Sequence, residues 1–535
     1  MRHLVLAGCC VCLATLSGSA PAADGEKPLE PVRSFEVRAG RAFYLNGKPF
    51  FPLMAWLQDP KNFPLLRECG MNATAGYWRS SGGTKNAREY LDLVAAAGLY
   101  GIMPFDAALK DHPALLAYIH DDEPDLPTQV SDARIEPGKQ LRINRRTPLW
   151  KLLDGDLTSW SVLDPLEGAS LTIQLKEPVT AVSLAVHVTV SKGLAMPKEV
   201  AFEADGTEIL RATLAPQRGR QKFDLPRPAT FRNLTFKVLS ITPGDNEWGS
   251  LGEIEAFDRD GRNVLLAPPR MVSRSTPEKT MEHYRQIKSA DPSRPVFMTL
   301  TANFHPHFKK WPEDQRQPLY RAFIAAADVV GYDVYPIYGW NRPDWIHLCS
   351  ECTRLLADLA GEKPVYAWIE TSKGGQWTGD LDRQKDVTPV HIRAEVWMSI
   401  CRGATAIGYF THIWKPSYSQ FGVPEENRRA LRQINDQITR LTPAILGAPA
   451  KRSVKIESDG AKLDVMAREH DGELYLFTVN YDERMKGAKA SVRVEGLTAG
   501  TVVTVVDEQR TLRAYDGFFE DDFAPLAVHI YRLGR

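Results

Sequence analysis

The sequence lacks a net charge, because 66 Lys and Arg residues balance 66 Asp and Glu residues. A chain without a global field does not concentrate nucleic acid or an anionic membrane around itself, so a neutral or weakly charged partner is favoured. Beyond the N-terminus, no apolar run approaches the ~20 residues that a membrane span requires. We therefore expect neither a nucleic-acid partner nor a membrane span.

Cysteine is scarce, and three of the seven cysteines fall within the first twelve residues. Of the other four, only Cys349 and Cys352 lie close together, and they fall in an amphipathic, helix-like stretch at 345–359. A zinc or redox role needs a partner motif that the sequence does not supply. We interpret both residues as helix packing.

The N-terminus has the pattern of a secretory signal. An apolar stretch at 4–16 follows a basic start, and Ala20-Pro21-Ala22 has the small residues of a cleavage site. We predict a signal peptide at 1–23 and a secreted or periplasmic protein. A lipoprotein signal ending at Cys9 is the less favoured alternative, because the apolar segment before it is short.

After a short hairpin that starts at Phe35, strand-like and helix-like stretches alternate. Eight apolar strand candidates lie at 51–56, 72–78, 100–105, 116–120, 296–301, 329–335, 365–370 and 406–411. Continuous apolar strands separated by helices are typical of a parallel sheet, and eight of them indicate a closed barrel. The predicted fold is an α/β (β/α)8 TIM barrel built from residues 35–133 and 266–449.

Two further segments have a different character from the barrel. Residues 134–265 show short alternating runs and no long helical pattern, which predicts an inserted β-sandwich. Removing this insert leaves a barrel close to the ~250 residues typical of the fold. Residues 450–535 alternate again, with Asp459-Gly460 and Asp471-Gly472 as turn signals, and predict a C-terminal β-sandwich.

Two glutamates close apolar strands that we number four and seven of the barrel, namely Glu123 and Glu370. The active sites of such barrels gather at the C-terminal ends of the strands. Two carboxyl groups there suit glycosidic cleavage, in which one protonates the leaving oxygen and the other attacks the anomeric carbon. The predicted substrate-binding residues around them are Trp56, Trp78, Arg79, Asp122, Asn303, His305, Tyr335, Trp368, His412 and Trp414. We interpret Asp106 and Asp333 as loop structure, and we predict neither a cofactor nor a metal in the barrel, whose histidines lack metal-ligand spacing.

This arrangement resembles the retaining glycoside hydrolases of clan A, and the phrase at 109–124 is the most specific part. The resemblance implies that Glu123 is the acid/base and Glu370 the nucleophile of a secreted enzyme acting on an oligo- or polysaccharide. From their positions after strands two and six, we expect Arg79 to pair with the nucleophile and Tyr335 to hydrogen-bond to it. Asp122 departs from the pattern, because the clan usually has Asn at this position.

The insert resembles a discoidin-like (coagulation-factor C-domain) sandwich in two stretches, 152–160 and 248–257. Such domains often bind glycans, and some hold a structural calcium, for which Asp154 and Asp156 are the candidate oxygen ligands. The alternative to an enzyme is a non-catalytic glycan-binding protein that uses the barrel and the insert as binding platforms. The partner is a carbohydrate in both interpretations.

Overall fold

A closed parallel barrel forms the centre of one of two units in this computed structural model, which describes residues 29–78, 83–482 and 484–534. In barrel order, its strands are β4 (Leu53–Trp56), β5 (Ala73–Ala75), β6 (Tyr100–Pro104), β7 (Leu115–Ile119), β17 (Val296–Thr301), β18 (Val329–Asp333), β19 (Val365–Glu370) and β20 (Ala404–Phe410). The predicted TIM barrel is confirmed. The predicted signal segment and Arg79 lie outside the described residues.

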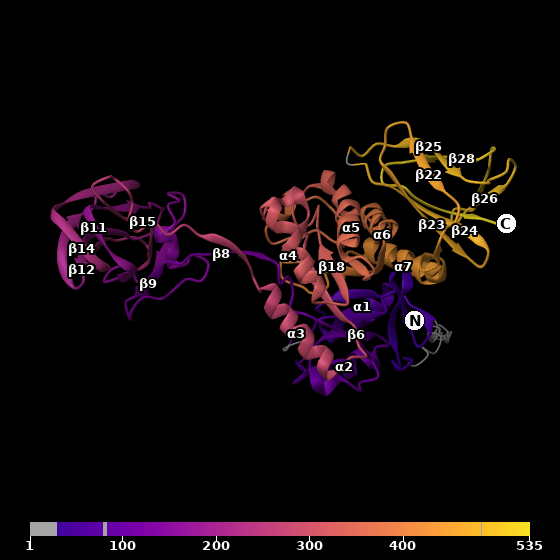
Figure 1. The fold of residues 1–535 in the computed structure, drawn as a ribbon, viewed down its shortest axis with the longest axis horizontal. Coiled ribbons are helices and arrows are strands. Elements are labelled where there is room, and N and C mark those ends of the chain that lie inside the picture. The colour runs from indigo at the N-terminus through magenta and orange to yellow at the C-terminus, as the bar shows by residue number, and fades with distance from the viewer. Residues whose placement is uncertain (1–28, 79–82, 483, 535) are drawn as a thin grey trace, which may run out of the picture. The chain divides into compact units, whose positions relative to one another are not determined.

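Helices alternate with these strands around the barrel (Figure 1). They are α1 (Phe63–Glu68), α2 (Ala87–Ala96), α3 (Pro277–Ala290), α4 (Glu313–Ala325), α5 (His347–Ala360), α6 (Pro389–Cys401) and α7 (Glu425–Ile445). Between β6 and β7 the described chain forms only a 3-10 turn, Ala107–Leu109. None of the described helices is both long enough and apolar enough to cross a bilayer.

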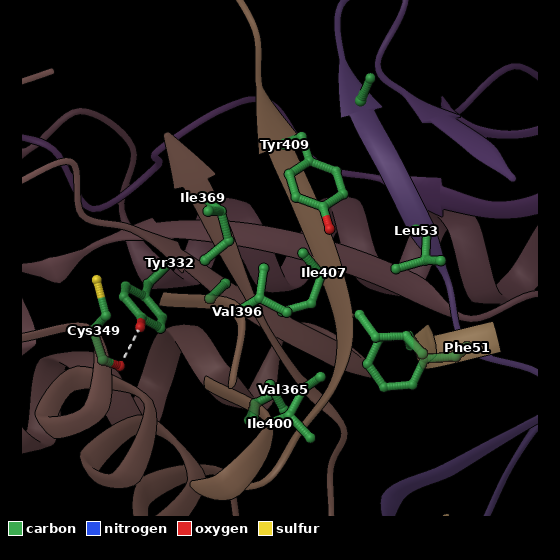
Figure 2. Close-up of a cluster of buried hydrophobic side chains, with 14 of the residues drawn as sticks. Phe51, Leu53, Tyr332, Cys349, Val365, Ile369, Val396, Ile400, Ile407 and Tyr409 are labelled. Carbon is green, nitrogen blue, oxygen red and sulfur yellow. Dashed lines mark hydrogen bonds between the residues drawn. The ribbon is translucent and has the colours of Figure 1, made fainter. Parts of the chain in front are cut away.

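Large side chains fill the barrel interior, and glycines opposite them make the space. A Cβ atom on Gly331 would lie 2.2 Å from the Tyr366 ring, and one on Gly408 would lie 2.2 Å from the Trp368 ring. Outside the strands, apolar residues of the helices pack against the barrel (Figure 2), where the Tyr332 hydroxyl donates to the Cys349 carbonyl at 2.8 Å. The interior of the barrel and the layer between its strands and helices are therefore tightly packed.

The inserted unit spans Pro127–Ser273 and has its own hydrophobic core. Its antiparallel strands are β9 (Arg134–Pro137), β10 (Ser161–Leu163), β11 (Ser170–Val188), β12 (Met196–Ala204), β13 (Thr207–Thr213), β14 (Gly219–Thr242) and β15 (Gly249–Phe257). The chain enters and leaves this unit through β8 (Pro127–Val130) and β16 (Arg270–Ser273), which pair with each other. The predicted inserted sandwich is confirmed.

The C-terminal strands form two further sheets, as predicted, and belong to the same unit as the barrel. One sheet contains β21 (Ala448–Pro449), β23 (Leu463–His470), β24 (Glu473–Asn480), β26 (Val502–Val505), β27 (Arg510–Arg513) and β29 (Val528–Leu533). The other contains β22 (Val454–Ser458), β25 (Ala488–Val494) and β28 (Phe518–Phe523). Trp397 of α6 stacks on Phe477 with 5.5 Å between ring centroids, and Arg402 pairs with Asp464. These contacts join the sheets to the barrel.

Candidate functional site

A cleft of about 630 Å³ opens at the C-terminal ends of the barrel strands. Its lining is Trp56, Leu57, Trp78, Asp122, Glu123, Asp333, Tyr335, Tyr338, Gly339, Gln376, Trp377, Phe410, His412, Trp414 and Tyr418. These residues come from segments that are far apart in sequence and that the barrel brings to one face. The lining combines flat apolar rings with a few polar groups, the usual composition of a small-molecule site.

The aromatic residues form a connected wall. Phe410 stacks on Trp414 with 6.1 Å between centroids and an interplanar angle of 8°, and Tyr335 contacts Phe410 at 4.9 Å. Trp377 is 83% exposed and Trp78 is 45% exposed. Rings left this open offer apolar faces to a ligand, whereas the packed rings behind them keep the wall rigid.

Three carboxyl groups face this wall, from Asp122, Glu123 and Asp333. The carboxyl group of Asp333, at the end of β18, hydrogen-bonds to that of Glu123, which follows β7. Such a bond requires a proton on one of the two groups. Burial and the charges of Glu123 and Asp122 raise the pKa of Asp333 well above its usual range, so Asp333 holds the proton. Burial, with the charge of Glu123, also raises the pKa of Asp122 to about 7.

Arg274 supplies positive charge beside this group. Its Nη2 lies 3.4 Å from Oε2 of Glu123, and its Nη1 donates to the Asp122 carbonyl at 2.8 Å. A guanidinium near a carboxylate favours the ionised form. The cleft therefore holds a protonated carboxyl group, Asp333, next to Glu123, which has the Arg274 guanidinium beside it.

The backbone at Glu123 adopts an unusual conformation. Its φ is +47°, in the left-handed region that residues with a side chain rarely occupy. The neighbouring Asp125 is completely buried and anchors this turn by accepting from the Thr301 amide at 2.9 Å and the Tyr320 hydroxyl at 2.7 Å. Backbone strain fixed by such anchors is concentrated at functional sites.

His412 takes part in the wall as a neutral hydrogen-bond donor. Its Nε2 donates to the carbonyls of Trp56 at 3.0 Å and Leu57 at 3.2 Å. Burial lowers the pKa of His412, so the ring adds no positive charge to the cleft. Its role there is to tie β20 to the loop after β4.

Glu370, the nucleophile that the sequence resemblance implies, lies behind the surface of the cleft. Its side chain is completely buried and is not part of the cleft lining. Its carboxylate accepts from the backbone amides of Ile337 at 2.9 Å and Tyr338 at 2.6 Å, and it also faces Glu395 of α6. The structure therefore does not bring the predicted nucleophile into the cleft with Glu123.

The other predicted site residues divide into two groups. The cleft lining includes Trp56, Trp78, Asp122, Glu123, Tyr335, His412 and Trp414. Trp368 instead lies in the barrel interior, where its Nε1 donates to Thr299 at 3.0 Å. Asn303 donates to Thr301 at 2.8 Å, and His305 lies 3.7 Å from Glu351. Neither of these two lines the cleft.

Several lining residues were not predicted, namely Asp333, Tyr338, Gln376, Trp377, Phe410 and Tyr418. Asp333 had a usable signal, because it ends a barrel strand as Glu370 does. Trp377 follows the Gly374-Gly375 pair in the loop after β19, whose two glycine amides donate to Gln384. Loop residues of this kind have no periodic pattern that would have marked them.

The two candidate calcium ligands of the insert, Asp154 and Asp156, face different partners. Glu253 is completely buried, accepts from the Gly155 amide at 2.9 Å and hydrogen-bonds to the Asp154 carboxyl group. Its Oε2 has no partner among the described residues. Asp156 turns instead to Thr158, accepting from its amide at 2.9 Å. The described residues contain no cluster of three or more His, Cys, Asp or Glu suited to a metal. A calcium site therefore stays a prediction, for which Asp154 and Glu253 are the facing carboxyl groups.

At a hundredfold excess over its Kd, Ca²⁺ should increase the free energy of unfolding of chelator-treated protein by about 2.7 kcal/mol. We therefore expect Ca²⁺ to raise the Tm. Burial raises the pKa of Glu253 to about 9, so a bound cation would have to displace its proton. Glu253→Gln should remove the response, because an amide cannot become the anionic ligand that the cation needs. The exposed Glu177→Gln is the matched control and should keep it. Differential scanning calorimetry with Ca²⁺ and with Mg²⁺ measures the effect. An equal response to both ions, or a response that survives Glu253→Gln, contradicts a calcium site here.

No protein-family model and no curated protein sequence matches the chain. The insert is similar to the family 32 carbohydrate-binding module of NanJ from C. perfringens, solved with galactose, at 13% identity and a TM-score of 0.21 over 24% of this chain and 98% of that one. It is also similar to the family 32 module of AlyQ, solved with 4,5-unsaturated mannuronic acid, at 14% identity and a TM-score of 0.20 over 24% and 98%. The chain is similar to the alpha-amylase of Geobacillus thermoleovorans, solved with acarbose, at 10% identity and a TM-score of 0.35 over 49% of this chain and 58% of the amylase.

Proposed function

We propose that this protein is a glycoside hydrolase whose active site is the cleft at the C-terminal ends of the barrel strands. The observation that carries this proposal is the hydrogen-bonded pair of Glu123 and Asp333 within a wall of exposed aromatic rings. Glycosidic cleavage needs one protonated and one ionised carboxyl group, and aromatic faces suit the C–H faces of sugar rings. Export through the segment at 1–23 is part of the proposal.

The charges in the cleft favour roles that differ from those implied by the sequence resemblance. Asp333, which holds the proton, would protonate the leaving oxygen, and Glu123, whose carboxyl group lies 3.4 Å from the Arg274 guanidinium, would attack the anomeric carbon. In a second step Asp333 would deprotonate the water that releases the sugar from Glu123. The sugar must enter between the two groups and break their hydrogen bond. The proposal keeps the retaining outcome, with Asp333 in place of Glu370, and it requires the two carboxyl groups to move apart to a separation of about 5 to 5.5 Å, as in retaining enzymes, when the sugar enters.

The test is a screen of the full chain against aryl glycosides and oligosaccharides, with proton NMR of the first product formed. We expect hydrolysis of at least one substrate and a first product with the anomeric configuration of that substrate. An inverted first product contradicts double displacement. Glycan binding in the cleft by calorimetry without any hydrolysis contradicts the enzyme and supports the glycan-binding alternative.

A second role, glycan binding by the insert, is favoured by a separate hollow of about 290 Å³ in that unit. It is lined by Leu157, Thr158, Ser159, Trp160, Thr189, Val190, Ser191, Leu194, Arg218, Trp248 and Ser250. Trp160 is 44% exposed there, so its ring is open to a ligand. Hydroxyl groups beside an open indole are suited to a sugar.

We expect Trp160→Ala to weaken binding of the full chain to glycans in affinity gels by about tenfold, as loss of a stacking aromatic predicts. The matched control is Tyr515→Ala, which removes a ring that is 54% exposed in the C-terminal sheets. Hydrolysis of small aryl glycosides in the barrel cleft should be unchanged in both variants. Equal retardation of both variants and wild type on every polysaccharide tested contradicts a binding role for the insert.

A further inference from the structure

Glu395 of α6 is a buried acidic residue to which the cleft chemistry gives no role. Its side chain is completely inaccessible, and no other side chain among the described residues donates a hydrogen bond to it. Of the groups that the structure describes, only the backbone amide of Glu370 interacts with it as a donor. An ionised carboxylate left in that state would carry a large desolvation penalty. Within the described part of the chain, its charged neighbour is the carboxyl group of Glu370 at the end of β19.

The two buried groups are compatible only if they share a proton. Burial, followed by the charge of Glu370, raises the pKa of Glu395 well above its usual range. Glu395 therefore keeps its proton and donates a hydrogen bond to the carboxylate of Glu370. The other hydrogen bonds to the Glu370 carboxylate come from the turn after β18. Its oxygens accept from the amides of Ile337 at 2.9 Å and 3.1 Å and of Tyr338 at 2.6 Å.

That turn forms part of the cleft. Tyr335, Tyr338 and Gly339 all line it, and the Gly339 amide donates to the Tyr335 carbonyl at 2.8 Å. The rings of Tyr335 and Tyr338 both contact Phe410, at 4.9 Å and 5.4 Å. A chain of contacts therefore runs from α6 through Glu370 to the aromatic wall.

We propose that Glu395 is a positioning residue, whose carboxyl group holds Glu370 against the amides of Ile337 and Tyr338 and so fixes the turn that carries Tyr335 and Tyr338 into the cleft. Glu395 acts through Glu370 and touches no substrate. The expected effect on KM rests on the proposed function, whereas the ordering of the turn by Glu395 does not. Charge-assisted bonds of a carboxylate to backbone amides are strong enough to order a turn.

Two substitutions separate the hydrogen bond from the bulk of the side chain. Glu395→Gln keeps a donor for Glu370, and Glu395→Met keeps the length but removes the donor. We expect Glu395→Met to speed hydrogen exchange at the amides of Ile337 and Tyr338 by about tenfold or more, and Glu395→Gln to leave it within about threefold of wild type. Ile400→Ala, a buried change on the same helix, is the control for lost stability alone.

Kinetics on a glycoside that the wild type hydrolyses give the second measurement. Glu395→Met should raise KM by about tenfold with a smaller change in kcat, because the aromatic wall binds substrate without taking part in bond cleavage. Glu395→Gln should restore KM, and Ile400→Ala should leave it unchanged. If the wild type hydrolyses nothing, the proposed function fails, while the exchange measurement still tests whether Glu395 fixes the turn after β18. Amides that stay protected in Glu395→Met overturn the inference, as does Glu395→Gln behaving like Glu395→Met.

Discussion

Glu123→Gln is expected to lower kcat/KM by at least about 10³-fold on every glycoside that the protein hydrolyses, equivalent to ~4 kcal/mol of transition-state stabilisation. The amide has the shape of the carboxylate but lacks its charge, so it can neither attack the anomeric carbon nor balance the positive charge that develops there. Activated leaving groups such as dinitrophenolate should not rescue the variant. Initial rates on a matched pair of dinitrophenyl and methyl glycosides measure the effect.

The control for Glu123→Gln is Glu362→Gln, an exposed glutamate before β19 at the opposite end of the barrel. It should keep wild-type rates, and circular dichroism should show both variants folded. The roles implied by the clan resemblance give a different pattern. If Glu123 is only the acid/base, its variant will keep activity on the dinitrophenyl substrate, and Glu370→Gln will lose activity on both substrates.

Asp333→Asn is expected to lower kcat/KM by about 10²- to 10⁴-fold on the methyl glycoside and by less than about tenfold on the dinitrophenyl glycoside. The reason is that dinitrophenolate leaves without being protonated, whereas an alkoxide does not. Because burial and nearby carboxylates raise the pKa of Asp333, the wild type should lose activity as pH rises through that pKa. The variant has no such proton to lose, so the alkaline limb of its pH profile should disappear.

The matched control for Asp333→Asn is Asp344→Asn, which changes a half-exposed aspartate on the same β18–α5 connection. It should retain both rates and the alkaline limb. An alkaline limb that persists unchanged in Asp333→Asn would assign that proton to another group. Equal losses on the two substrates would contradict proton donation by Asp333.

The barrel could be predicted from sequence because its strands are continuous apolar runs. The predicted ranges 296–301 and 365–370 coincide with β17 and β19, and the other strand predictions overlap the observed ones. The insert and the C-terminal sheets could be predicted because their alternating pattern differs from that of the barrel. These features depend on local periodicity, which a single sequence displays.

The second carboxyl group of the site could not be chosen from the sequence. Asp333 and Glu370 both end barrel strands, and strand position alone does not say which side chain opens into a cleft. The direction of the Glu370 side chain depends on the turn after β18, whose amides bind Glu370, and on Glu395 of α6. Trp377 and Tyr418 belong to loops, whose paths are set by contacts distant in sequence.

The paired strands at the base of the insert have a consequence for the order of folding. β7 and β17 are neighbours in the barrel, where Tyr118 pairs with Val296, yet the whole insert separates them along the chain. Joining the ends of so long a segment carries an entropic cost that slows assembly. The β8–β16 ladder, where Thr128 pairs with Val272, brings those ends together once the insert has folded. During synthesis the insert emerges before β17, so it can fold first and convert a distant pairing into a nearly local one.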